Sequence, residues 1–160
     1  MTMDVTDLAA VRTDHVRHIA TTLRDVRGPL LPILHAVQED LGHVDPADVP
    51  VIADVLNLSV AEVHGVVTFY RDFRRAPAGR TTVRICQAEA CRSVGAEALG
   101  EHAKHRTGVG FGETTSDGAI TLDEVFCLGN CALAPAVQVD DRLHGRVSPA
   151  RFDALLGEAR

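Results

Sequence analysis

The stretch CLGNCALAP, residues 127–135, contains two of the four cysteines of this 160-residue chain, Cys127 and Cys131. The other two, Cys86 and Cys91, begin and end the stretch CQAEAC, so the cysteines form one Cys-x4-Cys pair and one Cys-x3-Cys pair. Four thiolates are the usual protein ligands of a 2Fe-2S cluster, in which each iron takes two protein sulfurs and shares two bridging sulfides. The pattern therefore predicts one metal centre that uses every thiol, in a protein that transfers electrons.

Two other uses of the thiols remain open from their spacing. Structural zinc sites favour Cys-x2-Cys pairs, but their spacing extends to four intervening residues, so the pattern is unusual for zinc without excluding it. A thioredoxin-type redox pair needs Cys-x2-Cys, which this sequence lacks, and no histidine lies near enough in the sequence to suggest a thiolate–imidazole pair. Iron–sulfur binding is the favoured interpretation, and zinc is its main alternative.

The residues before the first cysteine pair predict the elements that hold it. Residues 82–85 alternate in the manner of a strand that ends directly in Cys86. Cys91 is expected in the loop that enters an alanine-rich helix over residues 93–106. This arrangement would attach the first pair to one end of a sheet.

The second pair encloses the tripeptide LGN, which is expected to be a loop ahead of a further strand. Gly129 lies inside this loop, and without a side chain it lets backbone N–H groups approach the sulfurs closely, so it is a predicted hydrogen-bond donor position. Two such loops at one end of a small sheet can converge on one cluster. The other elements expected here are strands over 119–122, 136–139 and 143–147, and a terminal helix that starts at Ser148 and Pro149.

The part of the chain before residue 74 has the periodicity of helices. Apolar stripes predict helices over 14–27 and 30–41. Asp45 and Pro46 resemble the start of a third helix that ends at Asn57, and the pattern S-x-x-E at 59–62 predicts a capping box that opens a fourth. The segment RRAPAGR, residues 74–80, has no apolar periodicity and is the expected linker. The predicted fold class is therefore α+β, with a helical domain over 1–75 and a mixed domain over 80–160.

Composition limits the classes of partner and compartment. The net charge of −6, with basic residues scattered among more numerous acids, argues against a nucleic-acid-binding protein. Residues 1–12 lack the basic start and apolar run of a signal peptide, and no stretch approaches the roughly 18 apolar residues of a membrane span. We expect a cytoplasmic protein without membrane insertion, in which reduced thiols serve as ligands rather than as disulfides.

No motif in the sequence indicates a catalytic site. The stretch GVGFG at 108–112 lacks the G-x-G-x-x-G spacing of a dinucleotide site and is better explained as a loop that ends a helix. Walker A, nucleophile-elbow and HExxH motifs are absent, and no acidic pair is singled out as a general acid and base. The four cysteines are the predicted metal ligands, and no catalytic residue is predicted.

Four stretches of the chain together form a recognisable pattern: LLPILHAVQEDLG at 30–42, EVHGVVTFY at 62–70, PAGR at 77–80, and CLGNCALAP at 127–135. With these stretches the chain resembles a known family, the thioredoxin-like 2Fe-2S subunits related to the 24 kDa subunit of respiratory complex I. The resemblance implies an N-terminal helical bundle followed by a thioredoxin-like 2Fe-2S ferredoxin domain. It also implies that Cys86, Cys91, Cys127 and Cys131 ligate one 2Fe-2S cluster.

Within that family the chain is most similar to the gamma subunit of soluble NAD-dependent formate dehydrogenase. The stretches concerned are FYRDFRRAPAGR at 69–80, CQAEACRSVGAEAL at 86–99 and VDDRLHGRVS at 139–148. The resemblance implies a partner flavoprotein subunit that binds FMN and NAD, and a larger subunit whose molybdenum or tungsten cofactor oxidises formate. This chain would exchange electrons with the FMN and would have no substrate site.

Three alternatives to that function remain. The chain could be the equivalent 2Fe-2S subunit of an NAD-linked hydrogenase or of NADH:quinone oxidoreductase. It could also be a free-standing ferredoxin-like carrier, although a diffusing carrier needs no helical domain. The third is a zinc-stabilised interaction module, which would be colourless when purified.

Overall fold

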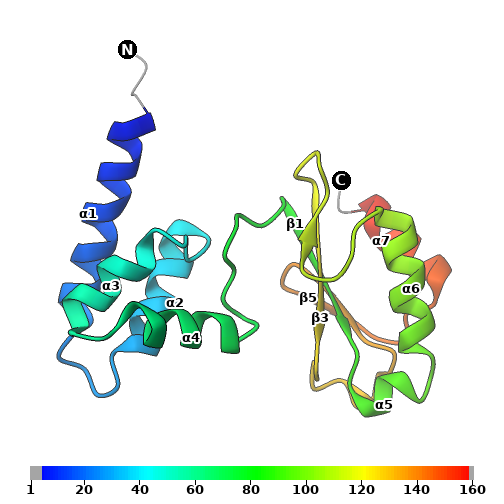
Figure 1. Ribbon diagram of the computed structural model, residues 1–160. Helices are drawn as coiled ribbons and strands as arrows, with labels where there is room; N and C mark the ends of the chain where they lie inside the picture. Colours follow the sequence, from blue (N-terminus) through cyan, green and yellow to red (C-terminus); the bar gives the residue numbers. More distant parts are fainter. Residues whose placement is uncertain (1–4, 159–160) are drawn as a thin grey trace. The chain divides into compact units, whose positions relative to one another are not determined.

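In the computed structural model, which describes residues 5–158, the chain forms two compact units that divide between Pro77 and Ala78 (Figure 1). This division falls within the RRAPAGR segment. The first four and last two residues lie outside the described residues. The predicted domains, 1–75 and 80–160, include these ends. The expectation that residues 1–12 are not a signal peptide also falls partly on them.

The first unit consists of helices, and its first helix differs from the prediction for 14–27. Its buried residues begin at Val16, as the predicted pattern has them, but the helix includes earlier residues and excludes Val26, which is exposed. Val26 donates its backbone N–H to the carbonyl oxygen of Leu23, in a turn that ends the helix ahead of Gly28. The helices are α1 (Val5–Leu23), α2 (Leu30–Leu41), α3 (Asp48–Leu56) and α4 (Val60–Phe69).

The ends of the later helices follow local signals, with one exception. Asn57 has the left-handed conformation predicted for it, and both hydrogen bonds of the capping box between Ser59 and Glu62 are present. The exception is the start of α3, which was expected at Asp45. There the Asp45 carboxylate accepts the N–H of Ala47 in a local turn, and the helix begins only at Asp48.

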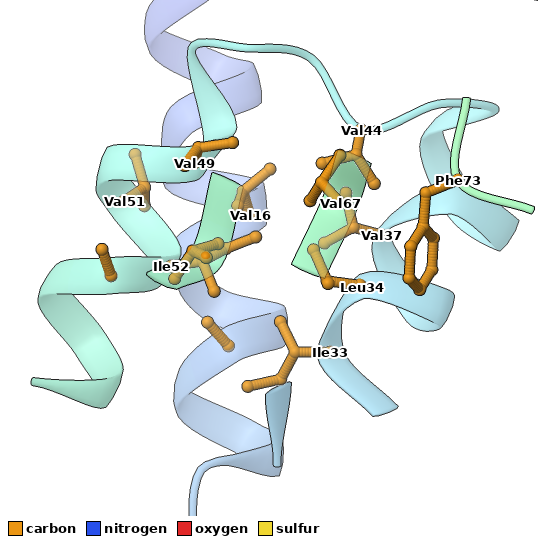
Figure 2. Close-up of a cluster of buried hydrophobic side chains, with 13 residues drawn as sticks. Val16, Ile33, Leu34, Val37, Val44, Val49, Val51, Ile52, Val67 and Phe73 are labelled. Carbon is orange, nitrogen blue, oxygen red and sulfur yellow. The ribbon is translucent and has the colours of Figure 1, made fainter. Parts of the chain in front are cut away.

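Aliphatic side chains from all four helices form the core of this unit, with Val16, Ile33, Ile52 and Val67 among them (Figure 2). The carboxylate of Asp48, which is 2% exposed, is bound by Arg12 of α1 through two hydrogen bonds of 3.0 and 2.7 Å. This ion pair raises the pKa of the Arg12 guanidinium. Within residues 5–158 no single helix is long and apolar enough to cross a bilayer, and α3 and α4 meet that criterion only jointly, as a pair bent by 119°.

The second unit contains a five-stranded sheet in the order β2-β3-β1-β4-β5. The central pair, β1 and β3, is parallel, and the other pairs are antiparallel. The predicted combination of helices and a sheet is therefore confirmed. The elements are β1 (Thr81–Cys86), α5 (Glu89–Arg92), α6 (Ala96–Thr107), β2 (Glu113–Thr114), β3 (Ile120–Val125), the 3-10 helix η1 (Cys131–Leu133), β4 (Val137–Val139), β5 (Arg142–His144) and α7 (Pro149–Glu158).

Alternate residues of the central strands face the helices α6 and α7, which lie on the same side of the sheet (Figure 1). Val83 and Leu122 are fully buried there, and Leu99 of α6 and Phe152 of α7 complete the core. The predicted helix over 93–106 corresponds to α6, which begins at Ala96 because Gly95 ahead of it has a φ of +98°, and the short helix α5 before it was not predicted. The short strand β2 was not predicted, because two residues carry no periodic signal.

Candidate metal centre

The first cysteine pair is buried at one end of the sheet. Cys86 is the last residue of β1, as predicted, whereas Cys91 lies in the short helix α5 instead of a loop. Both side chains are 1% exposed and pack with Ala96 and Ala136. The N–H of Cys86 donates to the carbonyl oxygen of Ala136 at 3.0 Å, which attaches the end of β1 to the chain that follows the second pair.

The second pair lies in an exposed loop, as the LGN tripeptide predicts. The two Sγ atoms of Cys127 and Cys131 are 3.9 Å apart, and Cys131 opens η1. Gly129 has a φ of +72°, and its N–H donates to the Sγ of Cys127 at 3.3 Å, so the predicted donor position is confirmed. Cys127 itself has a φ of +128°, a conformation that a residue with a side chain adopts only where its surroundings enforce it.

The two loops lie close together, since the charge of a thiol in each pair shifts the pKa of a thiol in the other pair. Burial raises the pKa of Cys91, and the neighbouring Cys86 thiol and the charges of Cys86 and Cys131 raise it further, against a backbone hydrogen bond from Ala136. The hydrogen bond and charge of Cys127 raise the pKa of Cys131, to which burial and the charge of Cys86 also contribute. Without a cation these neighbours favour protonated thiols, and metal binding would release the protons.

The separation of the exposed thiols is compatible with a tetrahedral metal. Two thiolates on one tetrahedral metal, with bonds of about 2.3 Å, lie roughly 3.8 Å apart, which the Cys127–Cys131 separation of 3.9 Å matches. A tetrathiolate zinc site needs all four sulfurs around one ion, whereas a 2Fe-2S cluster divides them into two pairs. Four thiols arranged as two pairs therefore fit the donor set of the cluster.

One residue that the sequence analysis missed supports the buried pair. Gln87, directly after Cys86, is 8% exposed, and its Nε2 donates to the carbonyl oxygen of Ala96 at 2.9 Å. Its backbone N–H donates to the carbonyl oxygen of Val125 at 2.8 Å. Gln87 thus joins the first cysteine loop to α6 and to the end of β3. A lone glutamine after a predicted strand gives no sequence signal of this role.

Comparison with known proteins also points to a 2Fe-2S protein. The family model described as thioredoxin-like [2Fe-2S] ferredoxin matches residues 16–160. A subunit of the NADH-quinone oxidoreductase of Pseudomonas aeruginosa is 37% identical over 149 residues, which cover 93% of this chain and 90% of that protein. The NADP-reducing hydrogenase subunit HndA of Solidesulfovibrio fructosivorans is 32% identical over 137 residues, which cover 86% of this chain and 80% of that protein.

A solved structure has a similar fold. One chain of an NAD+-reducing [NiFe]-hydrogenase in the H2-reduced state superposes with a TM-score of 0.65 and 25% sequence identity. The match covers 81% of this chain and 22% of the hydrogenase chain. With the family match over most of its length, and with two pairs of thiols at one end of a small sheet, the chain belongs to the thioredoxin-like [2Fe-2S] ferredoxin family.

Proposed function

We propose that this chain is the electron-transfer subunit of an NAD-linked oxidoreductase and that Cys86, Cys91, Cys127 and Cys131 hold its 2Fe-2S cluster. The observation that carries the proposal is the convergence of two loops, one with a buried thiol pair and one with an exposed pair whose Sγ atoms are 3.9 Å apart. When bound, the cluster supplies a store for one electron at a time.

The residues of the chain have separate tasks at this site. The hydrogen bond from Cys86 to Ala136 and the packing of Cys91 in an apolar cluster hold the first pair in place. The N–H of Gly129 points at the Sγ of Cys127, where it stabilises negative charge on the sulfur. Because the second pair is exposed, a redox group on a partner protein can approach the site from that side.

We further propose that the parent complex is a cytoplasmic NAD-dependent formate dehydrogenase. In that complex a flavoprotein subunit binds FMN and NAD, a larger subunit carries molybdenum or tungsten, and this chain exchanges electrons with the FMN. The support is the similarity of residues 69–80, 86–99 and 139–148 to the formate dehydrogenase gamma subunit. All four cysteines are free thiols, which is consistent with a reducing compartment.

A second candidate is the equivalent subunit of an NADH-quinone oxidoreductase or of a hydrogenase. Relatives that carry these names share 31 to 37% identity with this chain. The solved hydrogenase chain adds a structural likeness. The two candidates have the same cluster site and differ only in the catalytic partner.

Isolation of the native complex through a tag on this chain tests the proposal. We expect a flavoprotein and a molybdenum- or tungsten-containing subunit to co-purify, and the complex to reduce NAD+ with formate. Co-purification of hydrogenase or quinone-reductase subunits would instead assign the second candidate. A monomer with a reducible cluster and no flavoprotein partner would indicate a free-standing carrier and contradict the subunit assignment.

A further inference from the structure

The chain that follows Cys131 is held from two sides. On one side, the carbonyl oxygen of Ala136 accepts the N–H of Cys86. On the other side, the segment after β5 donates two backbone hydrogen bonds, from Arg146 to the Leu133 carbonyl oxygen at 2.7 Å and from Val147 to the Pro135 carbonyl oxygen at 3.0 Å. The segment 145–147 therefore supports the loop of the exposed cysteine pair.

Gly145 lies where this support is closest. A Cβ atom on Gly145 would lie 2.6 Å from the Cβ of Leu133, 2.8 Å from its carbonyl oxygen and 3.0 Å from the Nδ2 of Asn130. Contacts below 3.0 Å essentially never occur for real Cβ atoms, so the neighbours would have to move. Asn130 directly precedes Cys131 and Leu133 ends η1, so the displaced atoms belong to the turn that carries this cysteine.

The glycine is required by this close approach and not by its backbone conformation. Gly145 is not among the residues with positive φ, so an alanine would be acceptable there if space allowed. The chain also contains two glycines that serve as controls. A Cβ on Gly79 would lie 2.9 Å from the backbone of Ile120, at the end of β1 opposite to Cys86, whereas a Cβ on Gly157 in α7 would meet nothing within 4 Å.

We propose that Gly145 is a positioning residue for the exposed cysteine pair, an inference that rests on the proposed cluster site. Its missing side chain lets segment 145–147 contact η1 directly, and this contact sets the position of the Cys131 Sγ relative to that of Cys127. A side chain at this position displaces η1, which moves the pair away from the geometry that two thiolates on one metal require.

The test compares Gly145→Ala, Gly79→Ala and Gly157→Ala in the full chain after reconstitution with iron and sulfide. For Gly145→Ala we expect shifted g-values in the reduced-state EPR spectrum and loss of the cluster to a chelator about tenfold faster, the effect of overpacking by roughly 1.4 kcal/mol. Gly79→Ala lowers the unfolding temperature and keeps the wild-type g-values. Gly157→Ala keeps the wild-type g-values and rate of cluster loss, and its unfolding temperature does not fall, because alanine is more favourable than glycine in a helix.

A Gly145→Ala variant with wild-type g-values and a wild-type rate of cluster loss overturns the proposal, and so does an equal spectral change in Gly79→Ala. If Gly145→Ala does not fold, Leu133→Gly removes the opposing Cβ without adding an atom. We expect it also to shift the g-values, and an unchanged spectrum counts against Gly145. Failure of the wild-type chain to bind iron and sulfide contradicts the proposed function instead.

Discussion

The two cysteine pairs of this protein are held in different ways. Cys86 and Cys91 are buried in regular elements, β1 and α5, whereas Cys127 and Cys131 are exposed in a loop and a 3-10 helix. The first pair takes its geometry from the sheet, and the second from local packing and from a backbone with positive φ at Cys127. One half of the site therefore belongs to the core, while the other half is accessible to a partner.

The largest effect is expected from Cys86→Ser, because this residue is a proposed ligand and is also part of the core. We expect the variant to bind no cluster. In its metal-free form the buried hydroxyl should also lower the free energy of unfolding by about 1 to 3 kcal/mol. Iron content and urea unfolding measure the two effects. An unchanged unfolding midpoint would show that the buried pair does not belong to the core.

Cys127→Ser is the matched substitution in the exposed pair. We expect this variant to disrupt the cluster and to change its reduced-state EPR signal. Its metal-free unfolding free energy should stay within about 0.5 kcal/mol of the wild type, because an exposed side chain contributes little to packing. The same spectra and urea curves serve as the measurement. An unchanged reduced-state EPR signal would sink the assignment of Cys127 as a ligand.

The sequence predicted those parts of the site that depend on neighbouring residues. The end of β1 at Cys86, the loop at 127–131 and the donor Gly129 follow from alternation, from short polar stretches and from a glycine between two cysteines. The capping box at Ser59 is a local signal of the same kind. Family resemblance added the thioredoxin-like fold, which the family match confirms.

Features that depend on distant residues could not be predicted. The helix that holds Cys91 is four residues long, too short for a periodic signal. Gln87 and Gly145 owe their roles to contacts with Ala96 and Leu133, which only the folded chain brings close. Asp45 has the character of an N-cap but instead accepts a hydrogen bond within a turn, a choice that the sequence pattern does not distinguish.

Gln87→Met tests whether the hydrogen bonds of Gln87 support the buried cysteine pair. Loss of the hydrogen bond to Ala96 should lower the free energy of unfolding of the metal-free chain by about 1 kcal/mol, the usual contribution of one hydrogen bond. We expect faster cluster loss as well, measured by bleaching of the visible absorbance with a chelator.

A matched control for this variant is Gln38→Met in the helical unit, where Gln38 joins α2 to Asp72 and Arg74 through two hydrogen bonds. It should lower stability at least as much, because two hydrogen bonds are lost instead of one, and leave the rate of cluster loss unchanged. Equal rates of cluster loss in the two variants would contradict a specific role for Gln87.

Ser59→Ala, far along the chain from the cysteines, should give the smallest effect. Hydrogen bonds from the backbone and side chain of Ser59 lower the pKa of Glu62 below its ordinary value of 4.5. A lowered folded-state pKa contributes stability above the unfolded-state pKa, and this stability is lost as pH falls through the folded-state value. Loss of the Ser59 side chain as an N-cap should lower the free energy of unfolding by about 1 kcal/mol at pH 7. The loss should be smaller in acid, where Glu62 becomes protonated and its hydrogen bond with the Ser59 hydroxyl weakens.

Urea unfolding of the wild type and of Ser59→Ala, from pH 7 down into acid, measures the difference in their free energies of unfolding. A difference that grows toward low pH would contradict the sign. The EPR spectrum of the reduced cluster should be the same in both proteins.

The most direct test of the central claim is the metal and sulfide content of the purified wild-type chain, measured together with its reduced-state EPR spectrum. The two pairs of thiols predict two irons and two sulfides per chain, visible colour, and a signal from one 2Fe-2S cluster. A colourless chain with one zinc ion and no acid-labile sulfide would contradict that claim.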